Sequence, residues 1–198
     1  ARRQRQMCIR DRLDLRVNAL KKKRDAVLAE IRSAGLSAEP TAHSPLGIRL
    51  QGKPNLSKLP VFVSGEVEVQ DEGSQLLAPL LAPKRGEMVA DFCAGAGGKT
   101  LALGAAMKNT GRLYAFDTSA HRLDAIKPRL ARSGLSNVHP VAIAHERDER
   151  IKRLAGKLDR VLVDAPCSGL GTLRRSPDLK WRQTPETCLL YTSPSPRD

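Results

Sequence analysis

The stretch that decides the fold is EMVADFCAGAGGKTLALGAAMK, residues 87–108. Its first part, Glu87 to Phe92, is typical of a strand, and residues 93–98 form a glycine-rich turn. Residues 99–108 have the composition of a helix. Because glycines let a backbone approach a ligand closely, this strand, turn and helix predict a binding loop.

Further strands and helices alternate after this stretch. The pattern predicts strands at residues 111–116, 137–143 and 161–163, with a helix over 120–133. Such alternation builds a parallel sheet with helices on both faces, so we predict an α/β, Rossmann-like fold. The run Val161-Leu162-Val163 is typical of a strand buried on both faces, and ligands bind outside the carboxyl ends of such strands.

The expected ligand is a nucleoside without a pyrophosphate. Asp117 lies 20 residues beyond Gly97, where a carboxylate can accept hydrogen bonds from both hydroxyls of a ribose. A phosphate-loop pattern fails because its leading glycine would be Cys93, and a dinucleotide pattern fails because Thr100 replaces its third glycine. S-adenosylmethionine fits better, since it has a ribose and an amino-acid tail. The alternative is that the glycines only make a tight connection and Asp117 only caps the next helix.

A small domain is expected before this sheet. A strand at 15–18, a helix at 24–34 that stops at Gly35, and a strand at 47–50 suggest an α+β domain. Within it, Lys21 to Arg24 either contact phosphate or form the solvated start of the helix.

Five segments together resemble the bacterial RsmB/Sun-type (Fmu) RNA cytosine-5 methyltransferases. They are VQDEGSQ at 69–75, DFCAGAGGKT at 91–100, FD at 116–117, DAPCSGLG at 164–171 and RRSPDLKW at 174–181. The resemblance implies an S-adenosylmethionine-dependent methyltransferase domain over 66–187, preceded by a small RNA-binding-type domain over 13–65.

The resemblance also implies a set of site residues. Asp164 and Cys167 are the expected catalytic residues; a small buried hydrophobe is the plainer role for Cys167. Asp148 is expected beside the adenine, with His145 and Glu146 as alternatives. The expected cofactor-binding residues are Cys93, Ala94, Gly95, Ala96, Gly97, Gly98, Lys99, Asp117, Arg122, Asp148 and Asp164. The expected RNA-binding residues are Arg174, Arg175 and Lys180.

The implied chemistry needs two cysteines. Carbon 5 of cytosine is a poor nucleophile, so a thiolate adds to carbon 6 and makes carbon 5 reactive. In this family a later Thr-Cys motif supplies that thiolate, and Cys167 corresponds to the cysteine that releases the product. Thr187-Cys188 follows Cys167 by only 21 residues, too few for the helix and strand that separate the two cysteines in the family. We therefore expect a fragment that ends before its nucleophile and is inactive by itself.

Both ends of the chain are unlike the rest. Residues 1–12 have no apolar period and no counterpart in the family, and residues 188–198 resemble translated sequencing-adapter text. We expect both segments to be non-native, although residues 1–12 also suit a basic arm that binds RNA.

Composition agrees with a nucleic-acid partner. The chain has 34 lysines and arginines against 21 acidic residues, a net charge of +13, and such proteins neutralise phosphates. No long apolar run predicts a membrane anchor, and the four cysteines show no paired spacing typical of zinc or disulfides. We expect a cytoplasmic monomer whose partner is RNA, ribosomal or alternatively transfer RNA, with neither metal nor membrane.

Two other classes of function remain open at this point. One is a non-catalytic relic that binds RNA or cofactor, and the other is a methyltransferase that acts on a small molecule or a protein. A downstream reading frame with a strand and a Thr-Cys motif would argue against the first, and labelled methyl transfer to RNA would argue against the second.

Overall fold

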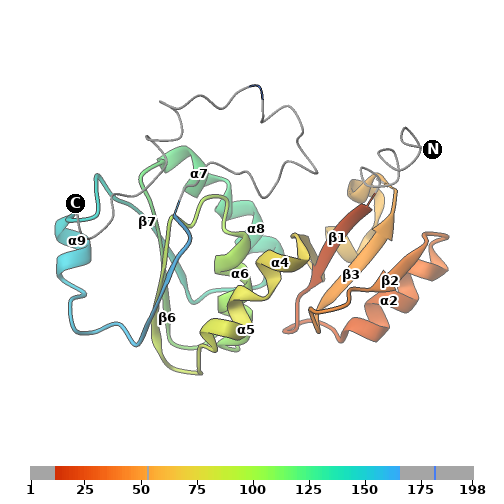
Figure 1. Ribbon diagram of the computed structural model, residues 1–198, viewed down its shortest axis with the longest axis horizontal. Coiled ribbons are helices and arrows are strands. Elements are labelled where there is room, and N and C mark those ends of the chain that lie inside the picture. Colours follow the sequence, from red (N-terminus) through yellow and green to blue (C-terminus); the bar gives the residue numbers. More distant parts are fainter. Residues whose placement is uncertain (1–11, 53, 166–180, 182–198) are drawn as a thin grey trace.

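The computed structural model describes residues 12–52, 54–165 and 181, and within them the chain forms two sheets (Figure 1). An antiparallel sheet comes first along the chain and a parallel sheet follows. The predicted fold class, an α/β sheet preceded by a small α+β unit, is confirmed.

The antiparallel sheet has the strand order β2-β3-β1-β4. Its strands are β1 (Arg12–Val17), β2 (Ala38–Pro40), β3 (Gly47–Gln51) and β4 (Val67–Val69). Helix α2 (Arg24–Ser33) packs on one face, where Val27 and Ile31 meet Leu15, Val17 and Ile48 in a buried core. The turn η1 (Leu56–Lys58) and helix α3 (Pro60–Val63) complete this unit.

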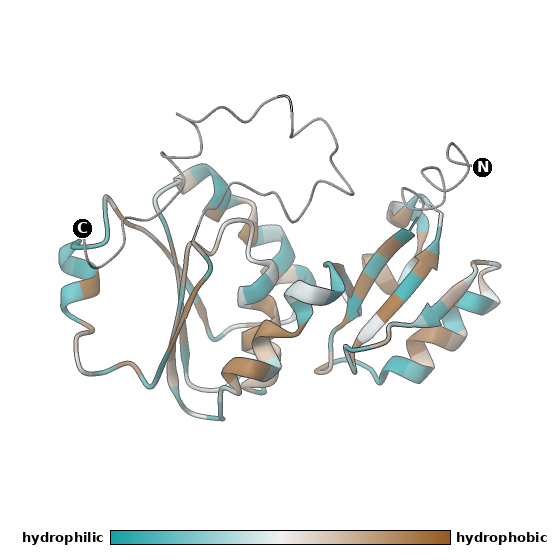
Figure 2. Ribbon diagram, viewed as in Figure 1, coloured by the Kyte–Doolittle hydropathy of each residue, from teal (hydrophilic) through white to brown (hydrophobic). Residues whose placement is uncertain are grey.

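Strand β1 is buried on both of its faces. Hydrophilic and hydrophobic residues alternate along it (Figure 2), and Leu15 and Val17 point into the core. Successive side chains of a strand point to opposite faces. Asp14 and Arg16 therefore leave the core side, yet they are only 7% and 4% exposed, because the second half of the molecule covers them.

The parallel sheet has the strand order β7-β6-β5-β8 within the described residues. Its strands are β5 (Met88–Phe92), β6 (Arg112–Asp117), β7 (Val138–Ala142) and β8 (Arg160–Val163). The helices are α4 (Glu72–Gln75), α5 (Leu77–Leu81), α6 (Gly98–Ala106), α7 (Ala120–Asp124), α8 (Ile126–Ser133) and α9 (Glu149–Lys152). All paired neighbours in this sheet run parallel.

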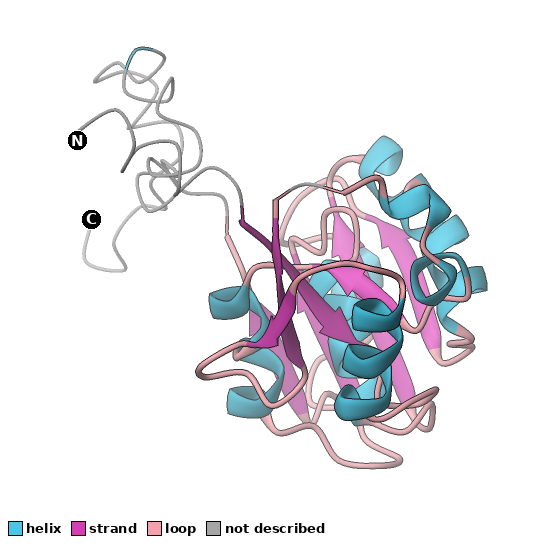
Figure 3. Cartoon of the chain, turned by 90° about the vertical axis from the view of Figure 1, so that its right-hand side faces the viewer, coloured by secondary structure: helices cyan, strands magenta, loops and turns pink. Residues whose placement is uncertain are grey.

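Helices pack against the parallel sheet (Figure 3), and two apolar clusters lie on its two faces. Val89 and Leu113 point to the face on which α5, α6, α7 and α8 pack. Ala90, one residue after Val89, and Phe116, three residues after Leu113, point to the opposite face, where Ile151 of α9 packs. Strand β5 pairs in parallel with β6, with Phe92 opposite Phe116, so the carboxyl ends of the two strands meet at one edge of the sheet.

The structure corrects one expectation about β8. Val161 is 42% exposed and Val163 is 65% exposed, so this strand is not buried on both faces. The physical reason is its position: β8 pairs with β5 on one side and is the outermost strand of the sheet as far as the chain is described.

A second difference concerns the helix predicted over residues 120–133. It is divided at Ala125 into α7 and α8, each with its own N-cap. The short strands β2 and β4, of three residues each, were not predicted. None of the described helices has the length and apolar character needed to cross a membrane.

Lys21 and Lys22 of the basic run at residues 21–24 contact other residues of the chain. Lys21 Nζ donates to the carbonyl oxygens of Ser64 at 2.6 Å and Arg132 at 2.7 Å, which ties the loop after β1 to α8. Lys22 forms ion pairs with Glu30 and Glu66. Both lysines are thus engaged by other residues of the chain, which differs from a solvated start of the helix, and phosphate contact by Lys21 to Arg24 stays a prediction.

Candidate functional site

The glycine-rich turn leaves β5 in a tight left-handed path. Cys93, Gly95 and Gly97 have φ angles of 60°, 56° and 80°. The turn is fastened to the end of the next strand because Ala94 N donates to Phe116 O at 2.9 Å. At Gly97 a side chain is excluded twice, by its φ angle and because a Cβ atom would lie 2.9 Å from Cγ1 of Ile126.

Asp117 lies at the end of β6 and holds the turn. It is 4% exposed; its Oδ2 accepts a hydrogen bond from Gly95 N and its Oδ1 accepts one from Ser119 N, each at 2.8 Å. Each carboxylate oxygen keeps a further lone pair for a ligand hydroxyl. The alternative role as a helix cap does not hold, since Ser119 is the N-cap of α7 and its side chain accepts from Arg122 N.

Asp91 is a fully buried carboxylate next to the turn, and sequence analysis gave it no binding role. Its Oδ2 accepts a hydrogen bond from Thr100 Oγ1 at 2.6 Å, while its Oδ1 has no hydrogen-bond partner among the described residues. Burial raises the pKa of Asp91 to about 6. A buried oxygen without a partner is costly, so this one is suited to a cationic or donor group of a ligand.

Asp164 follows β8 and reaches the same turn from the other side. Its Oδ2 lies 2.5 Å from Nζ of Lys99, in the first turn of α6, and its side chain is 44% exposed. Three carboxylates, those of Asp91, Asp117 and Asp164, therefore gather around residues 93–99. Burial and these three carboxylates raise the pKa of the Cys93 thiol, while Arg122 acts in the opposite direction.

The polar side chains of the loop that follows β7 form hydrogen bonds mainly with backbone groups of the same loop and of the start of α9. Asp148 is the N-cap of α9, and its carboxylate accepts from Ala144 N at 3.0 Å and Arg150 N at 2.9 Å, which lowers its pKa. His145 Nδ1 accepts from Arg147 N at 3.1 Å. The role of Asp148 beside an adenine, with His145 and Glu146 as alternatives, stays a prediction.

Four of the predicted site residues lie outside the described residues: Cys167, Arg174, Arg175 and Lys180. Their assignments stay predictions. No group of three or more His, Cys, Asp or Glu side chains that could hold a metal ion occurs in the described part of the chain.

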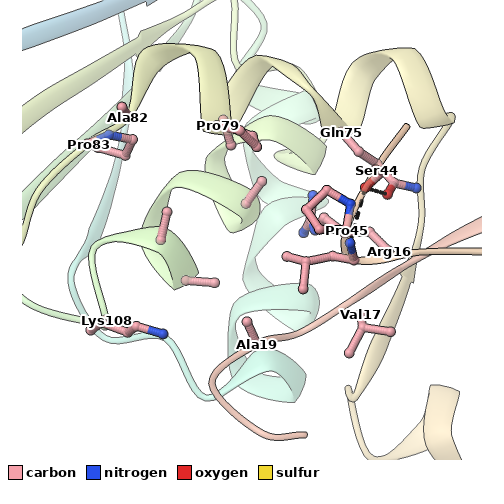
Figure 4. Close-up of a pocket in the computed structure, with 15 residues that line it drawn as sticks. Arg16, Val17, Ala19, Ser44, Pro45, Gln75, Pro79, Ala82, Pro83 and Lys108 are labelled. Carbon is pink, nitrogen blue, oxygen red and sulfur yellow. Dashed lines mark hydrogen bonds between the residues drawn. The ribbon is translucent and has the colours of Figure 1, made fainter. Parts of the chain in front are cut away.

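A separate apolar cavity of about 170 Å³ lies between the two halves of the molecule (Figure 4). Pro79 and Ala82 of the α5 region line it together with Arg16, Pro45 and Lys108. It borders the C-terminal half of α6, whereas the three carboxylates surround the N-terminal end of that helix. The cavity is therefore distinct from the carboxylate cluster.

Two family models cover most of the chain. Residues 78–194 match 16S rRNA methyltransferase RsmB/F, and residues 6–57 match the ferredoxin-like domain of RsmF/B-like methyltransferases. The chain belongs to the RsmB/F methyltransferase family. The predicted family is thereby confirmed, and the antiparallel sheet of this RsmB/F member lies largely in the region of the ferredoxin-like match.

Two curated relatives of this RsmB/F chain share a name. A probable ribosomal RNA small subunit methyltransferase B of Synechocystis sp. is 39% identical over 88% of this chain and 39% of its own length. The protein of the same name from Bacillus subtilis is 36% identical over 87% of this chain and 38% of its own length. The chain thus spans about two fifths of the length of these relatives.

Solved structures share the fold. A methyltransferase homolog from Pyrococcus horikoshii has a TM-score of 0.72 at 33% identity, covering 91% of this chain and 58% of that one. NSun6 from Pyrococcus horikoshii, solved with SFG, has a TM-score of 0.73 at 20% identity, covering 83% of this chain and 66% of that one. The second likeness bears on the fold alone.

Proposed function

We propose that the protein to which this chain belongs transfers a methyl group from S-adenosylmethionine to carbon 5 of a cytosine in ribosomal RNA. The observation that carries the proposal is the convergence of Asp91, Asp117 and Asp164 on one glycine turn at the carboxyl edge of a parallel sheet. Membership of the RsmB/F family and the names of the curated relatives support methyl transfer to ribosomal RNA, and the choice of carbon 5 of cytosine rests on the sequence resemblance.

The residues around the turn fit S-adenosylmethionine, which supplies an activated methyl group on a positively charged sulfur. Asp117 is placed to accept hydrogen bonds from the two ribose hydroxyls. Oδ1 of Asp91, which has no partner among the residues that the structure describes, suits the ammonium of the amino-acid tail. Gly95 leaves space beside it, because a Cβ there would meet only Cys93 O among these residues, at 3.9 Å. The turn carries no phosphate-binding pattern, in keeping with a ligand that lacks a pyrophosphate.

Asp164 is the residue that we place between cofactor and base. One of its oxygens pairs with Lys99, and its partial exposure leaves the carboxylate open to a substrate. A carboxylate there can accept a hydrogen bond from the amino group of cytosine as charge develops on the ring.

Cys167, three residues further, would release the product. A thiolate from the longer protein adds to carbon 6, carbon 5 takes the methyl group, and a base removes the proton from carbon 5 as the thiolate leaves. Cys93 is unsuited to the role of attacking thiolate, since its raised pKa keeps it protonated at neutral pH.

We assign RNA binding to the small unit, residues 13–65, and the reaction to residues 66–187. The basic composition of the chain supports an RNA partner through phosphate neutralisation. Arg174, Arg175 and Lys180 would hold phosphates near the reacting base.

The direct test is methyl transfer by the full-length protein. Small ribosomal subunit RNA is incubated with S-adenosylmethionine that carries a labelled methyl group, and the RNA is digested to nucleosides. The proposal predicts label in 5-methylcytidine. Label only in protein or in a small molecule would assign the protein to another class of methyltransferase, and binding without any transfer would indicate a relic.

A second test uses the release step. Changing Cys167→Ser in the full-length protein should trap a covalent protein–RNA adduct, visible as a slowly migrating band in a denaturing gel. The matched variant Cys93→Ala removes the other thiol near the turn and should trap none. Equal trapping in the two variants, or none in Cys167→Ser, would contradict the assignment of Cys167.

A further inference from the structure

Two arginines contact the glycine turn from the side of the antiparallel sheet. Arg16 of β1 donates from Nη1 to the carbonyl oxygen of Gly98 at 2.6 Å. Arg129 of α8 donates from Nη1 to the carbonyl oxygen of Ala96. The two carbonyls flank Gly97, so the arginines hold the turn on both sides of this left-handed residue, whose φ is 80°.

Both arginines are anchored by the segment that contains β4. Arg16 also donates to Oε1 of Gln70, and Arg129 makes a two-pronged ion pair with Glu68, at 2.9 and 3.2 Å. Glu68 is itself only 4% exposed. A guanidinium held by a buried carboxylate already has a fixed orientation. It therefore loses little further conformational freedom when it also donates to a carbonyl of the turn.

These contacts fix the peptide planes of the turn. A peptide unit is planar, so a carbonyl held on one side directs the following N–H to the other side. Holding the carbonyl of Gly98 thereby directs the N–H of Lys99, one of the first amides of α6, which have no partner within the helix. The side chains of Gln70 and Arg129 lie beside this turn, because a Cβ atom on Gly98 would make ordinary van der Waals contacts with Gln70 Nε2 at 3.7 Å and with an Arg129 nitrogen at 3.9 Å.

We propose that Arg129 and Arg16 are positioning residues through which the antiparallel sheet sets the affinity of the turn for S-adenosylmethionine. The inference rests on the proposed function for the identity of the ligand. The arginines act on the carbonyl side of the turn, and the ligand would meet its amide side. The ferredoxin-like unit is then part of the cofactor site as well as a neighbour of it.

Arg132 provides a matched control for Arg129. Both arginines belong to α8 and pair with the Glu68 carboxylate, and the exposed fractions of their side chains are similar, 21% for Arg129 and 24% for Arg132. Arg132 contacts the ring of Phe62 at 4.2 Å, whereas Arg129 contacts the turn. The variants Arg129→Met and Arg132→Met therefore each remove one arginine that pairs with Glu68, but only Arg129→Met also removes the hydrogen bond to the carbonyl oxygen of Ala96.

Two quantities report on the turn in each variant of the 198-residue chain. The dissociation constant for S-adenosylmethionine is obtained by NMR titration, which also covers weak binding, and amide hydrogen exchange is measured for residues 94–100 and for β5 and β6. Thermal melting reports the general loss of stability.

Arg129→Met should weaken binding about tenfold, the effect of losing one charge-assisted hydrogen bond, and should speed exchange in the turn but not in the strands. Arg132→Met should keep the dissociation constant within about twofold, although both variants lose an ion pair of similar worth. Arg129→Lys, which can reach only one of the two acceptors, should lie between Arg129→Met and the unchanged chain.

Equal weakening by Arg129→Met and Arg132→Met, or unchanged affinity and exchange in Arg129→Met, would overturn the proposal. If neither the unchanged chain nor the full-length protein binds S-adenosylmethionine, the proposed function fails. Hydrogen exchange then still tests whether Arg129 positions the turn. Faster exchange of the turn amides in Arg129→Met alone supports that role, and equal exchange in the two variants overturns it.

Discussion

Asp91 is the residue at which burial has the largest consequence for binding. Its carboxylate has one hydrogen bond and one oxygen without a partner in the described part of the chain, and desolvation raises its pKa to about 6. The pKa is higher in the folded chain than the ordinary value of 3.8, so ionisation of Asp91 costs stability, and stability falls as the pH rises from about 4 to about 6.

A pH-dependent affinity follows. Only ionised Asp91 attracts a ligand ammonium, so the dissociation constant for S-adenosylmethionine should rise about tenfold between pH 7 and pH 5, in proportion to the lost ionised fraction. Calorimetric titration at several pH values measures this. Asp91→Asn should bind more weakly at pH 7 and show a flat profile; a slope as steep as that of the unchanged chain would contradict the assignment.

For single residues of the site, some positions could be predicted from the sequence and some contacts are visible only in the structure. The spacing of Asp117 from Gly97 was sufficient to place that carboxylate beside the turn, because strand, turn and strand have nearly fixed lengths in this fold. The free oxygen of Asp91 was not predictable, since it depends on where Thr100 points. The contacts of Asp148 with its own loop likewise depend on the short helix α9, which the sequence pattern did not indicate.

At the scale of elements, the tight junction of turn and helix is set by Gly97. Its φ of 80° is unfavourable for any other residue, and the space beside it is filled by Ile126 of α8. The turn, α6 and α8 therefore pack as one unit. The division of the predicted 120–133 helix at Ala125 has a signal in the sequence that the prediction missed: Pro128 has no N–H to donate to the carbonyl of Asp124, and its ring clashes with that carbonyl in a continuous helix, whereas it is tolerated in the first turn of α8.

Two glycine variants separate these contributions. Gly86 has a φ of 81°, but a Cβ atom at this position would have no neighbour within 4 Å, so Gly86→Ala should cost about 1 kcal/mol from its backbone alone. Gly97→Ala adds the contact with buried Ile126 and should cost about 2 kcal/mol more. Urea unfolding measures both; equal losses would show that Ile126 moves aside freely.

At the scale of the whole molecule, the site is assembled from both halves of the chain. Arg16 comes from the antiparallel sheet, Asp117 from the middle of the parallel sheet and Asp164 from its outermost described strand. The order of the expected strands and helices along the chain indicated both sheets. The contacts between the two halves, however, involve polar residues whose partners lie more than 50 positions away in the sequence. Such pairings carry no local pattern.

The exposed face of β8 leads to a prediction for the longer protein. Val161 and Val163 leave apolar surface at the edge of the sheet, beside Asp164. A longer protein that covers this edge should hold Asp164 more firmly and bind S-adenosylmethionine more tightly than the 198-residue chain. Calorimetric titration of the two proteins compares them, and equal affinities would show that the covered edge does not contribute.

A crystal structure of the full-length protein with S-adenosylhomocysteine, the product form of the cofactor, would show whether these carboxylates bind the cofactor. We expect both ribose hydroxyls about 3 Å from the Asp117 carboxylate and the amino group of the tail at Oδ1 of Asp91. A ligand bound away from the turn, or with its ribose directed away from Asp117, would contradict this expectation.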